Sequence, residues 1–294
     1  MAENNLLEKQ ASGTAMATAY LRALAAHDSR KEIRGQDNLA KIFLSEEQKK
    51  SLQNTAAREW IRQNKVALGA YEFMIARTAF FDQVVEHALE ENIAQIVFLG
   101  AGYDSRPYRF EKLIQDTIIF ELDTKPTQRR KQNCLRRAHI HISKQIRFVP
   151  INFDTDKLAD KLVEGGFSRE KRTLYIGEGV TYYLSAAVVA NMLTFVRENT
   201  APGSSICFDY AAVSNEALNG AEELRNHMRI QHANEPTKFG IRAREIDSFL
   251  AKTGFEIVEH LTADEMTNKY LPSDAGLDIG KVPSLFCLVR ARVK

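Results

Sequence analysis

A buried strand that runs directly into a glycine turn is the feature that most constrains this chain. Residues 96–99 (Ile-Val-Phe-Leu) form an unbroken apolar run, typical of a parallel strand covered on both faces. Gly100, Ala101 and Gly102 follow, and a helix is predicted after them. Glycines at such a turn let backbone N–H groups approach a ligand closely, and the helix N-terminus favours polar or anionic groups. We therefore expect an α/β protein with a ligand at this turn.

Similar apolar runs recur along the rest of the chain, separated by helical stretches. Predicted strands cover residues 96–99, 117–122, 146–151, 172–176, 204–209, 255–259 and 285–293. Strands that alternate with helices indicate βαβ units and a parallel sheet. The last two runs indicate a closing hairpin. The sequence thus predicts a Rossmann-like sheet of about seven strands, mostly parallel.

The first 92 residues contain no predicted strand. Residues 14–26 are rich in alanine and other helix formers, Ser45 is a plausible helix cap, and residues 72–90 repeat apolar side chains at three- and four-residue steps. No linker divides the chain. We predict a single domain over residues 1–294, with a helical cap at 1–92, a core at 93–294 and a helical insertion at about 211–240.

Composition excludes several classes of protein. The 294 residues carry 40 Lys+Arg against 38 Asp+Glu, and no apolar run reaches the length of a membrane span. The N-terminus has no secretory signal pattern, so we expect a cytoplasmic protein without membrane contact. Three distant cysteines make a disulfide framework or a structural zinc site improbable.

An acid after the second strand points to a nucleoside cofactor. Residues 121–123 (Glu-Leu-Asp) follow the glycine turn by about 20 residues, where a carboxylate can accept both ribose hydroxyls. A dinucleotide fingerprint wants a third glycine at position 105, but Ser105 stands there. Its absence favours a ligand without a pyrophosphate, such as S-adenosylmethionine.

Three motifs carry a specific resemblance. Residues 99–109 (LGAGYDSRPYR), 120–123 (FELD) and 177–184 (GEGVTYYL) resemble motifs of the leucine carboxyl methyltransferase family, which includes polyketide carboxyl O-methyltransferases. Residues 18–23, 76–82 and 201–204 are similar to further family segments. The resemblance implies a class I methyltransferase sheet with an antiparallel last strand, and S-adenosylmethionine as cofactor.

The resemblance also implies cofactor-binding roles for individual residues. Arg77 would hold the methionine carboxylate, Glu178 would lie near the methionine amino group, and Asp123 would bind the ribose. Gly100, Ala101 and Gly102 would line the methionine part of the cofactor, and Glu121 would assist Asp123 at the ribose. Asn152 and Phe153 would lie beside the adenine. Arg22 would contact the cofactor from the first helix. Asn152 replaces the family's aspartate, which makes the adenine contact less certain.

The sequence identifies no general base. His227 and His232 lie in the predicted insertion and are the candidates, while Tyr182 and Tyr183 are candidates for orienting the acceptor. A carboxylate acceptor needs no base, whereas a hydroxyl usually does. We expect no metal, because Tyr210 follows Asp209 where a magnesium site would want an amide.

Residues 125–147 contain eight Lys and Arg and no acid. On a helix, Arg129, Arg130, Arg136 and Arg137 would share about a third of the circumference. This pattern fits an RNA patch, but no aromatic residue is interleaved for base stacking, so a solvated helix face is favoured and no nucleic-acid partner is expected.

The sequence thus predicts an S-adenosylmethionine-dependent O-methyltransferase acting on a carboxylate or hydroxyl of a small molecule. Two alternatives stay open: methylation of a protein C-terminus, which needs a wide and preferably basic groove, and a non-enzymatic S-adenosylmethionine-binding protein. The acceptor and the oligomeric state are not predicted.

Overall fold

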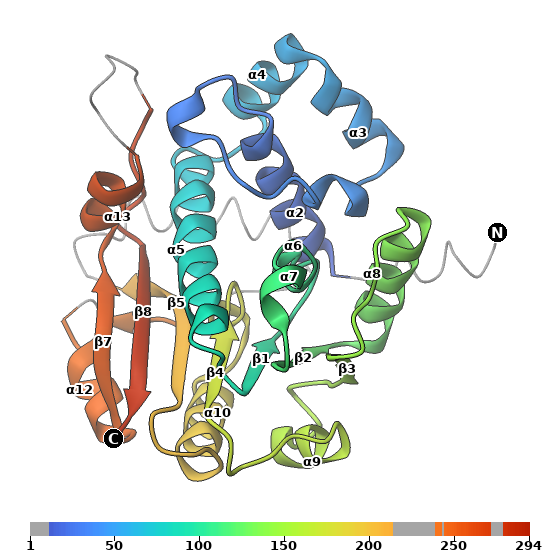
Figure 1. Ribbon diagram of the computed structural model, residues 1–294. Helices are drawn as coiled ribbons and strands as arrows, with labels where there is room; N and C mark the ends of the chain where they lie inside the picture. Colours follow the sequence, from blue (N-terminus) through green and yellow to red (C-terminus); the bar gives the residue numbers. More distant parts are fainter. Residues whose placement is uncertain (1–11, 214–238, 243, 272–278) are drawn as a thin grey trace.

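The computed structural model describes residues 12–213, 239–242, 244–271 and 279–294 (Figure 1). Most of the predicted insertion at 211–240, including the candidate bases His227 and His232, lies outside the described residues. Among the helices of the described ranges, none combines the length and the apolar content that a membrane crossing requires.

One sheet organises the described part of the chain. Its strands are β1 (Gln95–Leu99), β2 (Ile118–Asp123), β3 (Ile146–Pro150), β4 (Thr173–Gly177), β5 (Ser205–Val213), β6 (Ile241–Arg242), β7 (Phe255–Leu261) and β8 (Phe286–Val293). Their order is β3-β2-β1-β4-β5-β8-β7, with β6 paired to β5 outside this path. β8 runs antiparallel to both neighbours and the other pairs are parallel. The predicted fold is confirmed, but the sheet has eight strands rather than seven, because two-residue β6 is too short to leave a periodic pattern.

Helices precede the sheet and separate most of its strands. They are α2 (Gly13–Ala26), α3 (Glu46–Gln53), α4 (Thr55–Asn64), α5 (Ala70–Glu90), α6 (Arg106–Arg109), α7 (Glu111–Ile114), α8 (Lys125–Arg137), α9 (Leu158–Glu164), α10 (Ala186–Glu198), α12 (Ile246–Lys252) and α13 (Ala263–Tyr270), with short 3-10 turns η1 (Lys31–Ile33), η2 (Ala40–Phe43) and η3 (Thr181–Tyr183). The Ser45 side chain accepts from the Gln48 N–H, so the predicted cap of α3 is present.

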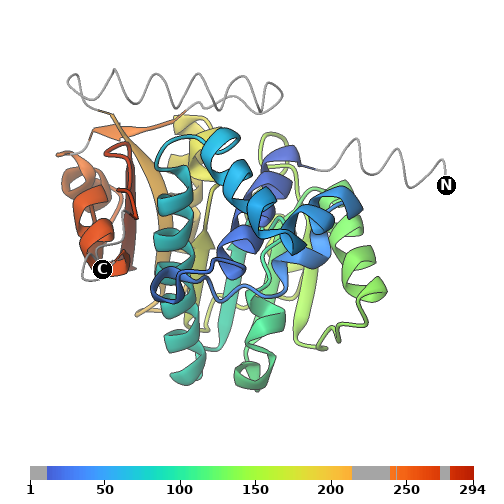
Figure 2. The same ribbon diagram turned by 90° about the horizontal axis from the view of Figure 1, so that it is seen from above.

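The two faces of the sheet bury different apolar clusters because side chains alternate along each strand. Ile96 and Phe98 join the cluster that includes α2 and α5, whereas Val97 and Leu99 join the cluster that includes α10 and α12. Seen from above, α2, α3 and α4 gather on the α5 side of the sheet (Figure 2). The predicted helical cap therefore packs on the same cluster as that face.

Helix α5 lies between the sheet and α2, so it is buried on several sides. Its buried residues include the cation Arg77, which is only 5% exposed. A charge at such a position must be paired, because removing it from water without a partner costs several kcal/mol. Its partners define the site.

Candidate functional site

The glycine turn after β1 has the backbone geometry that the sequence suggested. Gly100 and Gly102 have φ angles of +67° and +43°, in the region that favours glycine. A Cβ at Gly100 would lie 2.6 Å from Val180 Cγ2, so a larger residue does not fit. The Gly102 N–H donates to Asp123 Oδ2 at 2.7 Å, and the Ala101 N–H donates to the Leu122 carbonyl at 2.7 Å. The turn is thereby fixed against the end of β2.

The two acids of β2 have different partners. Glu121 is fully buried, where its carboxylate is 2.7 Å from Lys131 Nζ and accepts from the Tyr108 hydroxyl at 2.9 Å. Burial raises the pKa of Glu121 despite the lysine. Asp123 instead accepts from the backbone N–H groups of Gly102 and Thr124 and lies at the carboxyl edge of the sheet. Of the two predicted ribose ligands, Asp123 is the one at the glycine turn.

Arg77 and Glu178, both assigned to the methionine part of the cofactor, lie beside each other, and a third residue joins them. Arg77 Nε is 3.1 Å from Glu178 Oε1, and Nη1 donates to Asp209 Oδ2 at 2.9 Å. Asp209 also accepts from the Gly179 N–H at 2.7 Å. Burial opposes the charge on Arg77, but the two carboxylates outweigh it and raise the pKa of Arg77 above its usual value.

Arg106 connects this group to the glycine turn. Its Nη1 is 2.6 Å from both Glu178 Oε2 and Asp104 Oδ2, and its Nε is 2.7 Å from Asp82 Oδ1. We call the six residues the ion-pair cluster; they are Arg77, Asp82, Asp104, Arg106, Glu178 and Asp209. The arrangement holds the loop after β4 to the turn after β1.

Sequence reasoning did not predict the roles of Arg106, Asp104 and Asp209. Asp104 and Arg106 lie inside the motif at 99–109, which was interpreted only through its glycines. Asp209 was considered as a metal ligand, but here it pairs with Arg77. Within the described residues, no group of three or more His, Cys, Asp or Glu side chains is placed to hold a metal ion.

Arg22, Asn152 and Phe153 occupy the edges of the site. Arg22 is 5% exposed, and its Nη2 donates to the Tyr103 carbonyl at 2.6 Å while its Nε lies 3.0 Å from Asp37. It therefore braces the residue after Gly102. Asn152 is exposed and accepts from the Asp154 N–H, while Phe153 packs partly against the α10 cluster.

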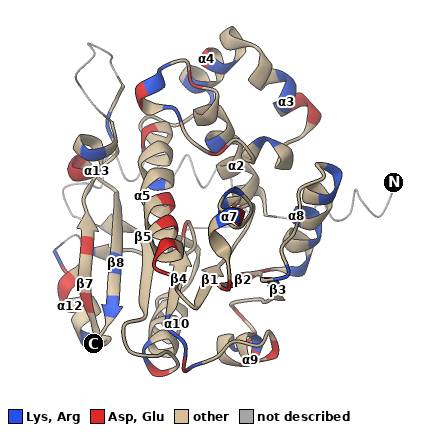
Figure 3. Ribbon diagram, in the orientation of Figure 1, with Lys and Arg blue, Asp and Glu red and all other residues tan. Residues whose placement is uncertain are grey.

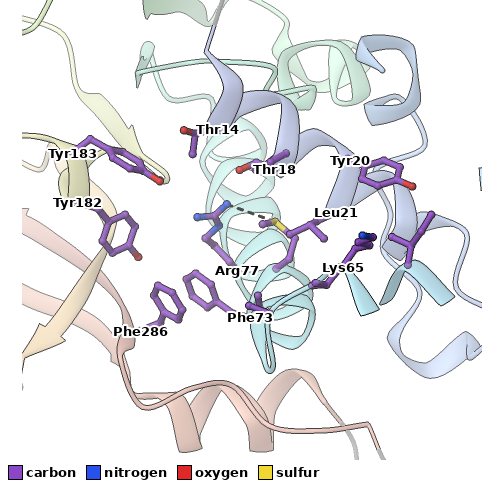
Figure 4. A pocket seen from close by; sticks show the side chains of 17 residues that line it. Thr14, Thr18, Tyr20, Leu21, Lys65, Phe73, Arg77, Tyr182, Tyr183 and Phe286 are labelled. Atoms are coloured by element: carbon purple, nitrogen blue, oxygen red, sulfur yellow. Dashed lines mark hydrogen bonds between the residues drawn. The ribbon is translucent and has the colours of Figure 1, made fainter. Parts of the chain in front are cut away.

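A cavity of about 240 Å³ opens beside Arg77 (Figure 4). Its walls are mostly apolar, and Phe73 and Phe286 stack on one side with ring centroids 3.9 Å apart. Tyr182 and Tyr183 line it from η3, and α2 closes the other side. The lining residues are Thr14, Ala17, Thr18, Tyr20, Leu21, Ile61, Lys65, Val66, Ala67, Ala70, Phe73, Met74, Arg77, Gly179, Tyr182, Tyr183 and Phe286.

The described walls of this cavity contain no Asp, Glu or His side chain. Burial, reinforced by the Asp209 carboxylate, raises the pKa of the Tyr182 phenol well above its usual value. Tyr182 is therefore neutral at physiological pH and can donate a hydrogen bond but not remove a proton. The cavity can orient an acceptor, but its described walls offer no general base.

Comparisons with known proteins agree with this geometry. A family model for leucine carboxyl methyltransferases matches residues 15–197. The chain is 30% identical over 232 residues to the Bacillus subtilis protein named "Putative S-adenosyl-L-methionine-dependent methyltransferase YktD", covering 78% of this chain and 75% of that protein.

Two solved structures share the fold. A duf574 family protein from Streptomyces avermitilis has a TM-score of 0.61 at 14% identity, covering 98% of this chain and 100% of that chain. A "putative methyltransferase" from Thermobifida fusca has a TM-score of 0.57 at 16% identity, covering 93% of this chain and 94% of that chain.

Proposed function

The chain belongs to the leucine carboxyl methyltransferase family and is an S-adenosylmethionine-dependent methyltransferase; from this premise, we propose that it methylates a carboxylate oxygen of a small, largely apolar molecule. The observation that carries the proposal is the apolar cavity beside Arg77, whose described walls contain no general base. A carboxylate is already ionised at neutral pH and needs none, whereas a phenol or an alcohol usually must lose a proton.

The residues at the carboxyl edge of the sheet fit the cofactor. Gly100 and Gly102 keep the turn free of side chains, and Gly179 lets the loop after β4 pack closely on Arg77, because a Cβ there would lie only 3.3 Å from Arg77 Nη1. Among the described residues, the hydrogen-bond partner of Arg77 Nη2 is Met74 Sδ, at 3.5 Å, and this nitrogen is directed into the cavity (Figure 4). We propose that this nitrogen receives the methionine carboxylate, that Glu178 attracts the amino group, and that Asp123 binds the ribose.

S-adenosylmethionine supplies a methyl group on a positively charged sulfur. The acceptor carboxylate attacks the methyl carbon in line as the carbon–sulfur bond breaks, and no proton is transferred. In this proposal, the protein aligns the acceptor carboxylate with the methyl group and excludes water from the site. Phe73, Phe286 and Tyr183 pack against the acceptor's apolar body, and the neutral Tyr182 hydroxyl donates toward its oxygen.

The small volume favours a small molecule over a protein C-terminus. Methylating a protein would require a wide groove, whereas this cavity is about 240 Å³ and is lined by α2 and the Phe73–Phe286 stack. A free aromatic or aliphatic acid is the class of acceptor that these walls match.

Calorimetry and a methyl-transfer assay test the proposal in two stages. S-adenosylhomocysteine should bind with one-to-one stoichiometry. Labelled methyl should then pass to members of a panel of aromatic and aliphatic acids, and mild alkali should release it as methanol, as it does from an ester. Transfer to the matching phenols or alcohols, in products stable to alkali, would contradict carboxylate methylation.

A cavity-filling variant tests where the acceptor binds. Ala17→Leu adds bulk to the α2 wall, so the KM for the acceptor should rise about tenfold while the affinity for S-adenosylhomocysteine stays the same. Gln63→Leu, at an exposed position of α4 outside the cavity lining, is the control. An unchanged KM in Ala17→Leu would place the acceptor elsewhere.

A further inference from the structure

A second and larger cavity lies on the other side of α2. It measures about 920 Å³ and is bounded by α8, η2 and α3, with Met16 and His27 contributed by α2. Because Thr14, Ala17, Thr18 and Leu21 face the smaller cavity, α2 is a wall of both. We call the larger one the α8 groove; none of the residues in the ion-pair cluster lines it.

The lining of the α8 groove is strongly basic. It includes Lys41, Lys49, Arg130 and Arg137, and its one carboxylate, Glu46, lies 2.8 Å from Lys49 Nζ. Lys41 and Arg137 are exposed and form no ion pair with any described residue. Figure 3 shows Lys and Arg gathered along α8. An anion in the groove would therefore be surrounded by an excess of positive charge.

Arg130 differs from Lys41 and Arg137 because its side chain is buried. The sequence placed it on an exposed face with Arg129, Arg136 and Arg137, but it is only 8% exposed, because α8 packs against η2. Its Nη2 donates to the Phe43 carbonyl at 2.8 Å and its guanidinium lies over the Tyr103 ring, 4.9 Å from the centroid. Its Nε and Nη1 are buried and have no hydrogen-bond partner among the described residues.

The other buried cations of the described chain all have a counter-ion, which Arg130 lacks. Arg22, Arg77, Arg106 and Lys131 each have a carboxylate within 3.1 Å. Within the same described residues, Arg130 has no carboxylate partner at all. A buried cation without a counter-ion is unfavourable, and an anion that reached it would form strong charge-assisted hydrogen bonds.

We propose that the α8 groove binds a small polyanion, such as a phosphorylated metabolite, in a site separate from the methyl-transfer site. One anionic group of the ligand pairs with the charged Arg130 side chain, which lines the groove. Its other anionic groups lie against Lys41, Lys49 and Arg137 at the more exposed end.

The size and lining of the groove favour a small molecule over a nucleic acid. Its volume lies in the range of small-molecule sites, roughly 300–1,000 Å³. The groove has no Phe, Tyr or Trp among its described lining residues, so it offers no such platform for stacking a base. Arg136, exposed on the same helix, does not line the groove. A nucleic-acid surface would use Arg136 and Arg137 alike, whereas a ligand in the groove uses only Arg137.

Sodium tripolyphosphate is a suitable probe. It is titrated by calorimetry into the full chain saturated with S-adenosylhomocysteine, because the bound nucleoside keeps tripolyphosphate out of the cofactor site. Sodium chloride is adjusted to keep the ionic strength constant. Wild-type protein should bind one tripolyphosphate, and Arg137→Gln should weaken this binding about tenfold, as expected for the loss of a charged hydrogen bond. Arg136→Gln is the matched control and should change the affinity less than about twofold.

Arg130→Gln should abolish the rise in melting temperature that tripolyphosphate causes in the wild type. Because this buried variant can lose its fold, Lys41→Gln provides a second test and should behave like Arg137→Gln. No saturable binding at millimolar tripolyphosphate would overturn the proposal. Equal weakening by Arg136→Gln and Arg137→Gln would also overturn it, as would tighter binding of a single-stranded oligonucleotide that depends on both arginines.

Discussion

The ion-pair cluster and the apolar cavity share Arg77 but are built in opposite ways. In the cluster, six charged side chains, four of them buried and two partly buried, form contacts of 2.6–3.1 Å with one another. In the cavity, Lys65 and Arg77 are the charged groups among the described walls, and the rest is mostly apolar. The difference indicates that charge in the cluster fixes loops in place, whereas the cavity offers a mostly apolar surface.

Arg77 is where the two regions meet, so replacing it should have the largest effect. Arg77→Met leaves Asp209 buried without a cation and Glu178 with Arg106 alone, which should lower the free energy of unfolding by about 3–5 kcal/mol. Binding of S-adenosylhomocysteine should be lost as well. Urea denaturation and calorimetry measure the two effects.

The control for this variant is Arg62→Met on α4, whose pair with Glu59 is partly exposed and should contribute less than about 1 kcal/mol. Retention of wild-type affinity in Arg77→Met would show that Arg77 serves the fold alone.

The same contrast recurs within β2, where Glu121 is paired inside the protein and Asp123 faces the turn. Glu121→Gln leaves Lys131 buried without its carboxylate and should cost about 3 kcal/mol of stability, with S-adenosylhomocysteine affinity unchanged. Asp123→Asn should instead weaken that affinity about tenfold and alter stability little. If Glu121→Gln weakens binding as much as Asp123→Asn does, the assignment of one acid to structure and one to ligand is wrong.

The glycine turn and the ion-pair cluster show how much of the site can be predicted from the sequence and how much cannot. The strand, the glycine turn and the Asp123 position follow from local patterns, because strand ends and alternation are encoded within a few residues. Arg77 and Glu178 were identified through motif resemblance. Their partners were not, because Arg77 and Asp209 are separated by 132 residues and Arg106 and Glu178 by 72, and such contacts leave no local pattern.

Arg130 shows a different limit. Helical periodicity correctly placed it on α8, but whether that face meets solvent depends on η2, which lies 87 residues earlier in the chain. The assignment of a solvated helix face therefore holds for the exposed Arg129, Arg136 and Arg137 and is wrong for Arg130.

Acidification tests the cluster more gently than a substitution at its centre. Burial opposes ionisation of Asp104, but Arg106 outweighs it and lowers the pKa of that carboxyl to about 2. A depressed folded-state pKa stabilises the fold above the unfolded-state value of 3.8, and this contribution disappears as pH falls through about 2. Asp104→Asn should thus cost about 2 kcal/mol at pH 6 and progressively less toward pH 2. Denaturation curves across this range check it, and a cost independent of pH would contradict the ion pair.

The smallest effect is expected at the exposed lysine of the cavity. Lys65→Met should raise the KM for an acidic acceptor about twofold at low salt and have no effect at high salt, because exposed charges are screened. The affinity for S-adenosylhomocysteine should not change. A large loss of turnover instead would mean that the apolar region relies on charge after all.

The double role of α2 has an evolutionary consequence. Its four small or aliphatic side chains Thr14, Ala17, Thr18 and Leu21 line the cavity beside Arg77, which we propose binds the acceptor, and none of them belongs to the ion-pair cluster. Mutations there can change which molecule fits while the machinery for handling the cofactor stays intact. Under the proposed function, relatives of this protein can acquire different acceptors through substitutions in α2 alone. Laboratory evolution toward a new acceptor should therefore begin at these four positions.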